Sequence, residues 1–223
     1  CEGSLSVKTY GNGAQILLVC FEGTDNTEYL GDWITNLNVD ANADGVHTGF
    51  ADALDTFLSA DGTTAGEALK AELHGSERVT YGELLLQYAQ RNDTQIVVTG
   101  HSLGGAMAQI TVQWLLSEGV DASAVSGYTF ASPLPFSKTA AWVTKAPYVN
   151  ARMYNLVNML DLVPYVGVGG TNVSSMADLC EQAANLWNLA MNSEDQAVGV
   201  SLSGVNLGIT IPFADLSLYQ GED

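Results

Sequence analysis

A serine flanked by two glycines stands near the middle of the chain, in residues 97–107, VVTGHSLGGAM. Gly100, Ser102 and Gly104 form the pattern G-x-S-x-G. A strand that turns sharply into a helix strains the residue at the turn and lifts its side chain above the sheet, and the glycines leave room for neighbouring chain. The pattern predicts that Ser102 is a nucleophile, with the N–H of Leu103 placed to donate a hydrogen bond to an oxyanion.

Alternating strands and helices are predicted around this turn. Residues 94–99 read as a buried strand and residues 103–117 as an apolar helix, which is the context that G-x-S-x-G requires and a chance match lacks. The order of the elements predicts an α/β fold with a mostly parallel sheet. Apolar runs and helical spacing indicate strands at 15–21, 126–131 and 152–158, β-like alternation over 197–211, and helices at 27–37, 48–59, 64–73, 80–91 and 175–191.

Length and composition limit the classes of protein to consider. The 223 residues contain no repeat and no Pro- or Gly-rich linker, so we expect a single domain over residues 1–223. The net charge of −18 argues against nucleic acid or anionic membranes as partners, because phosphate binding needs Lys and Arg. No apolar run approaches the ~20 residues of a membrane span. No signal peptide is visible, and the start at Cys1 indicates a processed or trimmed end.

The three cysteines cannot all pair with one another. Cys20 lies in the apolar run ILLVCF, where we expect a buried thiol. A disulfide between Cys1 and Cys180 is open at this stage, and so is the oligomeric state of the chain.

Four blocks of the sequence together resemble one family of hydrolases. They are CFEGTDNTEYLGDWITNL (20–37), VHTGF (46–50), VVTGHSLGGAMAQI (97–110), and YTFASPLP followed by YNLVNMLDLVPYV (128–166). The ordered set resembles the class 3 lipases, the α/β-hydrolases related to fungal triacylglycerol lipases. The resemblance implies an α/β-hydrolase fold, a mostly parallel central sheet flanked by helices. It also implies hydrolysis of carboxylic esters such as acylglycerols, transient contact with a lipid interface, no cofactor, and secretion.

The resemblance also implies roles for single residues. Ser102 corresponds to the nucleophile, and Asp161 in NMLDLVP corresponds to the acid of a Ser-His-Asp triad. The family usually carries Asn directly before this Asp, whereas here Asn158 stands three positions earlier. Thr24 corresponds to the Ser or Thr whose hydroxyl and N–H join the N–H of Leu103 in the oxyanion hole.

Residues 27–37, TEYLGDWITNL, have apolar side chains at the spacing of one helix face, namely Leu30, Trp33, Ile34 and Leu37. The resemblance places this segment where the fungal enzymes have a lid. An ordinary packed amphipathic helix has the same pattern, so both interpretations stay open.

The histidine that this resemblance implies is missing from its position. The expected chain order is nucleophile, acid and then histidine, and the family carries the histidine near the C-terminus in a pattern like H-x-L-x-x-Y. Residues 213–220, FADLSLYQ, match at Leu216 and Tyr219 and place Ala214 where His is expected. A shift of one residue would place Asp215 there, and an Asp with a pKa of ~3.9 is a weak acceptor for a serine proton.

The three histidines of the chain all precede Ser102 and are not expected to replace the missing one. His101 adjoins Ser102, but neighbours at a sharp turn point apart. His47 lies in a block shared with relatives that keep the late histidine, which indicates a packing role. His74 precedes Gly75 and has the position of a residue at the end of a helix.

Three interpretations of the chain follow. The first is an ester hydrolase inactivated by substitution at Ala214, which we favour over natural loss because the rest of the site matches the family pattern. The second is a non-catalytic acyl- or ester-binding protein on the same scaffold. The third concerns calcium: DANADG (40–45) has the spacing of a calcium loop, but Ala51 stands at the twelfth position, where such a loop has Glu. Chance in an Asp-rich chain explains that spacing better, and no metal is expected.

Overall fold

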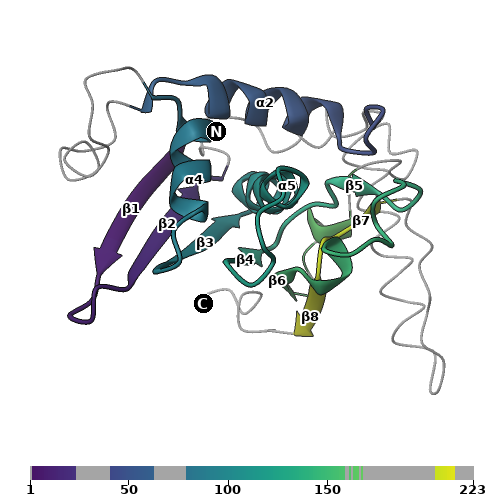
Figure 1. Cartoon of the computed structure of the whole chain (residues 1–223). Helices are drawn as coiled ribbons and strands as arrows, with labels where there is room; N and C mark the ends of the chain where they lie inside the picture. Colours follow the sequence, from purple (N-terminus) through teal and green to yellow (C-terminus); the bar gives the residue numbers. More distant parts are fainter. Residues whose placement is uncertain are drawn as a thin grey trace, which may run out of the picture.

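A six-stranded sheet forms the centre of the computed structural model, which describes residues 2–23, 41–62, 79–158, 161, 163–165, 167 and 204–213 (Figure 1). The strand order is β1-β2-β3-β4-β6-β8. β1 runs antiparallel to β2, and the other neighbouring pairs of this sheet are parallel. This arrangement confirms the predicted α/β fold with a mostly parallel sheet. The strands are β1 Gly3–Thr9, β2 Gln15–Phe21, β3 Thr94–His101, β4 Val125–Phe130, β6 Arg152–Asn158 and β8 Ile209–Phe213.

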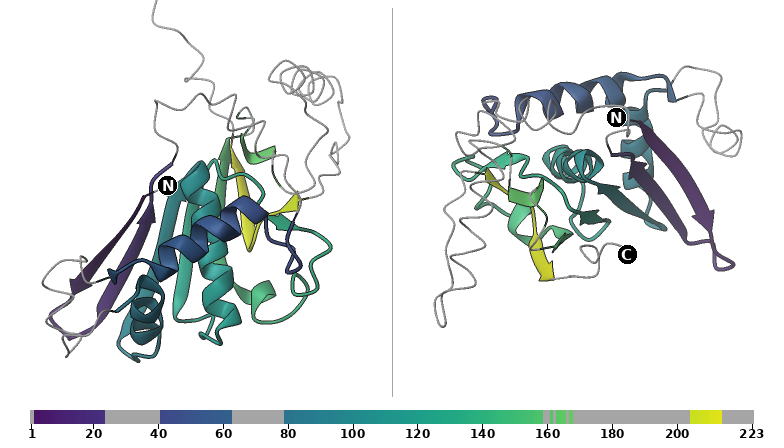
Figure 2. Two further views of the ribbon diagram at one scale, coloured as in Figure 1. Left: turned by 90° about the horizontal axis from the view of Figure 1, so that it is seen from above. Right: turned by 180° about the vertical axis from the view of Figure 1, so that it is seen from behind.

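The helices of the described chain pack on one face of this sheet (Figures 1 and 2). They are α2 Thr48–Ser59, α4 Tyr81–Ala89 and α5 Leu103–Ser117. α5 lies on β2, β3 and β4, α4 contacts β3, and α2 contacts both α4 and α5. Because α5 is enclosed between the sheet and α2, it is apolar around most of its circumference, and Met107, Ile110 and Leu115 are fully buried.

Local sequence signals determine where α2 and α4 begin. His47 caps α2, since its Nδ1 accepts a hydrogen bond from the Phe50 N–H at 3.4 Å. Thr80 and Glu83 form a capping box at the start of α4, in which each side chain accepts a hydrogen bond from the other residue's N–H. α5 has no side-chain cap and begins at the turn that holds Ser102. Packing, rather than a cap, therefore fixes the start of α5.

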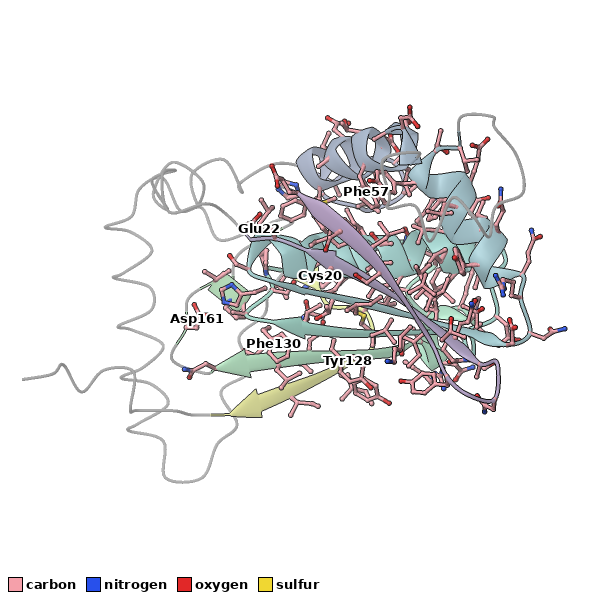
Figure 3. All side chains as sticks on the ribbon, turned by 90° about the vertical axis from the view of Figure 1, so that its left-hand side faces the viewer. Cys20, Glu22, Phe57, Tyr128, Phe130 and Asp161 are labelled. Atoms are coloured by element: carbon pink, nitrogen blue, oxygen red, sulfur yellow. The ribbon has the colours of Figure 1, made fainter. Side chains whose placement is uncertain are left out.

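The opposite face of the sheet carries exposed apolar side chains that none of the described helices covers. Across β6, the strand register places Tyr128 and Phe130 of β4 in line with Ile209 and Ile211 of β8. Ile209 is 59% exposed, and the other three are 42–45% exposed. Figure 3 shows Tyr128 and Phe130 on the side of the sheet away from the helices. We call this surface the apolar face, and its exposed members are Leu18, Tyr128, Phe130, Ile209 and Ile211.

Cys20 differs from the expectation of a buried thiol. Leu17, Val19 and Phe21 of β2 are buried against the helices. Because successive side chains of a strand point to opposite faces, Cys20 points toward the apolar face, where it is half-buried and free. Cys1 and Cys180 lie outside the described residues, so their pairing stays open.

Most predicted elements within the described residues are confirmed, with small differences at their ends. The strand predicted at 94–99 continues to His101, and the strand predicted at 126–131 ends at Phe130, where Ala131 takes a φ of 50°. β1 was not predicted. The predicted helices at 27–37, 64–73 and 175–191 lie outside the described residues. The strands at 15–21 and 152–158 and the helices at 48–59, 80–91 and 103–117 correspond to β2, β6, α2, α4 and α5.

A second, two-stranded sheet lies beside α5 and pairs β5 Phe136–Ser137 with β7 Gly204–Val205 (Figure 1). β7 and β8 confirm the β structure predicted within 197–211. Two short 3₁₀ helices, η2 Tyr148–Asn150 and η3 Val163–Tyr165, flank β6 in sequence. In the part of the chain that the structure describes, no helix is both long and apolar enough for a membrane span.

Candidate active site

Ser102 occupies a sharp turn between β3 and α5. Its backbone has φ 54° and ψ −125°, a region that residues with side chains rarely adopt. Its N–H donates to the Phe130 carbonyl at 2.9 Å, and its carbonyl accepts from the N–H groups of Gly105 at 2.9 Å and Ala106 at 3.3 Å. The predicted strand, sharp turn and helix are confirmed, and the nucleophilic role of Ser102 stays a prediction.

The two glycines of G-x-S-x-G allow backbone segments to approach closely. A Cβ atom on Gly100 would lie 2.2 Å from the Gly104 carbonyl oxygen, and one on Gly104 would lie 2.3 Å from the Phe21 carbonyl oxygen. Both clashes are with backbone, which cannot rotate away as a side chain can. The packing of β3, α5 and the end of β2 therefore requires glycine at both positions, as the motif predicts.

The oxyanion side of the turn is built from the start of α5 and the end of β2. Leu103 is the first residue of α5, so its N–H has no acceptor within the helix and lies at the positive end of the helix dipole. A Cβ atom on Gly23 would lie 3.0 Å from the His101 carbonyl oxygen and 3.6 Å from Ser102 Cβ. Thr24 follows Gly23 but lies outside the described residues. The oxyanion roles of Thr24 and Leu103 stay predictions, which the position of Gly23 favours.

Asp161 lies beyond the carboxyl end of β6 (Figure 3). Its N–H donates to the Asn158 carbonyl at 3.0 Å, and its Oδ1 accepts from the Val163 N–H at 3.0 Å. The side chain is half-buried. Since β3, β4 and β6 are parallel, Ser102 and Asp161 leave the sheet at the same edge, where α/β proteins collect their sites. The position at the end of a strand is confirmed, and the role of Asp161 in a triad stays a prediction.

The position expected to hold histidine follows β8 in the sequence. β8 pairs in parallel with β6, and Phe213 lies opposite Asn158. Both strands therefore end at the edge where Asp161 is found. Ala214 itself lies outside the described residues, as does the neighbouring Asp215, so the match to H-x-L-x-x-Y stays a prediction.

The histidines that the structure describes have the places expected of them. His101 ends β3 beside Phe130 on the apolar-face side and is exposed, whereas Ser102 is nearly buried at the turn. His47 is 3% exposed, and its ring stacks on Phe50 with ring centroids 4.3 Å apart, which confirms a packing role. His74 lies outside the described residues.

The segment with calcium-loop spacing forms a turn ahead of α2. Asn42 Oδ1 accepts hydrogen bonds from the main-chain N–H groups of Asp44 and Val46, each at 3.0 Å, and Gly45 takes a φ of 77°. This turn accounts for the Asn and Gly of the pattern. Asp40 lies outside the described residues. Within the described ranges, no cluster of three His, Cys, Asp or Glu side chains could hold a metal ion.

A buried polar cluster next to the site was not predicted. Gln109 of α5 is fully buried and forms hydrogen bonds with Ser132, Asn206 and Leu207. The one sign of this cluster in the nearby sequence is that a glutamine stands inside the mostly apolar stretch AMAQITV, residues 106–112. The partners of Gln109 lie far away in the sequence, so the sequence pattern gives no further sign of the cluster.

Comparison with known families gives one match, to the family described as Lipase (class 3), over residues 18–169. This match covers more than half of the chain and includes Ser102 and Asp161. A comparison with curated proteins finds no match.

Solved structures of lipases resemble this chain. M37 lipase matches with a TM-score of 0.54 and 17% identity, over 93% of this chain and 67% of that chain. The lipase from Rhizopus microsporus var. chinensis matches with a TM-score of 0.48 and 20% identity, over 73% of this chain and 55% of that chain. Lipase II from Rhizopus niveus matches with a TM-score of 0.48 and 17% identity, over 73% and 60%. The chain thus spans less than two thirds of these two fungal lipases. Its fold is the α/β-hydrolase fold, as the likeness to M37 lipase shows.

Proposed function

The chain belongs to the class 3 lipase family, and from this premise we propose that its site is built to hydrolyse carboxylic esters, with acylglycerols as the substrate class. The observation that carries the proposal is the strained backbone of Ser102, which the close packing of Gly100 and Gly104 imposes. Strain held at one serine, at the carboxyl edge of a parallel sheet, is typical of a nucleophile turn rather than of an ordinary loop.

In the complete triad, with histidine in place of Ala214, the reaction would begin when Oγ of Ser102 attacks the ester carbonyl carbon and its proton passes to that histidine. The carbonyl oxygen becomes an oxyanion, which accepts hydrogen bonds from the Leu103 N–H and from Thr24. Collapse of this intermediate expels the alcohol, which takes the proton from the histidine, and leaves the acyl group on Ser102. Water then attacks in the same way and releases the carboxylic acid. Asp161 accepts a hydrogen bond from the imidazole and holds its orientation.

Ala214 leaves this chain without the proton acceptor of that mechanism. Loss of the histidine from such a triad lowers turnover on the order of 10⁴-fold or more. The parallel pairing of β8 with β6 supports position 214 as the site of the histidine, since β8 leads to the edge of the sheet where Asp161 stands. We therefore propose that the chain is a hydrolase inactivated at position 214.

Hydrolysis of p-nitrophenyl butyrate by the unaltered chain, by Ala214→His and by Asp215→His tests the proposal. We expect Ala214→His to raise kcat by about 10³-fold or more, because it supplies the missing base. Asp215→His is the matched control, since it adds the same imidazole one position away. Adding Ser102→Ala to Ala214→His must abolish the gain. Circular dichroism of each variant confirms that it is folded.

Three outcomes would change the conclusion. A gain in Asp215→His alone would place the histidine position at 215. Equal activity in the unaltered chain and Ala214→His would mean that another residue is the base. No detectable activity in the unaltered chain or in either folded variant would contradict hydrolysis at this site.

A second candidate function is favoured by the same Ala214: an acyl- or ester-binding protein that does not turn over its ligand. This candidate predicts tight, saturable binding of a non-hydrolysable phosphonate diester to the unaltered chain, with no turnover of the ester even in Ala214→His. Weak binding by the unaltered chain would contradict it.

A further inference from the structure

A fully buried glutamine on α5 connects the serine turn to the last strand of the sheet. Gln109 lies about two helical turns after Ser102. Its Nε2 donates to Ser132 Oγ and to Asn206 Oδ1, both at 2.8 Å, and its Oε1 accepts from the Leu207 N–H at 2.8 Å. This one side chain joins segments that are up to 98 positions apart in the sequence.

Ser132 holds the glutamine in a fixed position relative to the serine turn. A Cβ atom on Gly105 would lie 2.7 Å from Ser132 Cβ, so the first turn of α5 packs directly on Ser132. The Ser132 hydroxyl accepts from Gln109 and donates to the Pro133 carbonyl at 2.9 Å. The amide of Gln109 is thereby oriented by two segments that adjoin the serine turn, namely α5 and the chain after β4.

A second buried amide fixes the start of β8 on the sheet. Asn155 Nδ2 donates to the carbonyls of Leu207 at 2.7 Å and Ile209 at 3.3 Å, and Asn155 Oδ1 accepts from the Thr129 hydroxyl at 2.7 Å. Asn155 belongs to β6, so together with the backbone pairing of β6 and β8 it holds β8 on the sheet. Gln109 belongs to α5, the helix that follows Ser102, so its bonds link the segment directly ahead of β8 to the serine turn.

We propose that Gln109 is a positioning residue for the candidate active site, fixing β8 and thereby the residue at position 214 relative to Ser102. β8 ends at Phe213, directly before Ala214, and the bonds of Gln109 hold Asn206 and Leu207 just ahead of its start, so Gln109 acts with the pairing to β6 in placing the strand. The inference rests on the proposed function, because it takes position 214 as the place of the proton acceptor. Gln109 itself touches no reacting atom.

The distance between positions 102 and 214 can be probed without catalysis. Ser102→Cys and Ala214→Cys are combined in a chain whose three native cysteines are replaced by Ser, and dibromobimane is added, which becomes fluorescent when it bridges two thiols. We expect bridging with Gln109 in place and a several-fold lower yield with Gln109→Met. Gln113→Met, a half-buried glutamine one turn later on the same helix, is the matched control and should leave the yield unchanged.

Activity provides the second readout. In the Ala214→His chain, Gln109→Met should lower kcat for p-nitrophenyl butyrate about 10- to 100-fold, the cost of misplacing a catalytic group by about 1 Å. KM should not change, because Gln109 does not contact substrate. Gln113→Met should change neither constant.

The two readouts separate this inference from the proposed function. Unchanged bimane bridging in folded Gln109→Met would refute the positioning role, whatever the activity. Lower bridging together with an inactive Ala214→His chain would support positioning and refute the proposed function. If Gln109→Met does not fold, Asn206→Ala removes one partner and keeps the Leu207 bond, and an undiminished yield in that variant would refute the inference.

Discussion

At Gly104 the serine turn has no room for even one additional carbon atom. A methyl group at this position would lie 2.3 Å from the Phe21 carbonyl oxygen and 2.8 Å from the Glu22 carbonyl oxygen. Relief requires α5 to move away from the end of β2, and that movement disturbs Ser102 and Gly23 together. The turn and the oxyanion side of the site therefore depend on the same close contact.

We expect Gly104→Ala to lower the free energy of unfolding by about 3 kcal/mol or more, because overpacking against rigid backbone lies at the upper end of such effects. Urea denaturation measures the loss. Gly11→Ala is the matched control, since a Cβ atom on Gly11 would have no atom within 4 Å, and its stability should stay within about 1 kcal/mol of the unaltered chain. Equal stability of the two variants would contradict the close packing.

The sequence predicts those parts of the site whose residues are near one another in the chain. Ser102 and its glycines are readable because strand, turn and helix follow one another within a few residues. Asp161 is readable as a position, since it follows an apolar strand and precedes a proline. Gln109 was missed because its partners Asn206 and Leu207 are 97 and 98 positions away, and no local pattern signals such a bond.

The loop between α5 and β4 contains a hydrogen bond whose contribution to stability depends on pH. Asp121 Oδ1 accepts from the Ser123 N–H at 2.7 Å, and its hydrogen bonds with Ser123 hold the pKa of Asp121 below its ordinary value. A carboxyl whose pKa is lower in the folded state stabilises the fold above its unfolded pKa of about 3.9. That stabilisation is lost as the pH falls through the folded value.

We therefore expect Asp121→Asn to lower Tm at pH 7 relative to the unaltered chain, and the difference to disappear as the pH falls through the lowered pKa of Asp121. Thermal unfolding followed by circular dichroism across this range measures it. Asp55→Asn, an exposed carboxylate of α2, controls for the removal of one negative charge from an acidic chain. A Tm difference that persists at low pH would contradict the assignment.

Helices and strands with a strong apolar pattern were predicted accurately, whereas a strand with a weak pattern was missed. β2, β3 and α5 are rich in buried apolar residues and were predicted within two residues at either end. β1 was missed because Leu5 and Val7 are its only apolar side chains, alternating with two serines and a lysine, which is the weak pattern of an antiparallel edge strand. Its place is decided by pairing with β2 rather than by its own sequence.

At the scale of the whole molecule, the apolar face and the net charge of −18 act against each other. The described strands contain no Asp or Glu, so the carboxylates of the chain lie elsewhere. Repulsion between copies keeps an acidic protein dispersed, whereas exposed apolar surface favours association. Removal of the charge should therefore let the apolar face bring copies together.

We expect light scattering to rise as the pH approaches the isoelectric point of about 4.1, where the repulsion vanishes. Ile209→Thr combined with Ile211→Thr should reduce this scattering, since it makes part of the apolar face polar and keeps β-branched side chains in β8. Val149→Thr is the control, because Val149 is 63% exposed but lies outside the apolar face. Equal scattering by all three chains would show that the apolar face does not drive association.

The hydrogen bonds of Gln109 to residues far away in the sequence have a consequence for the order in which the site forms during synthesis. The contacts that form the serine turn come from residues up to 132, whereas those that fix β8 come from residues 206 to 209. Chains are synthesised from the N-terminus, and contacts between near residues form before those between distant ones. The strained serine is thus assembled before β8 exists, and the strand that leads to position 214 joins it only after residues 206 to 209 have been made. Synthesis of β8, rather than formation of the turn, marks the moment at which this site can work as a unit.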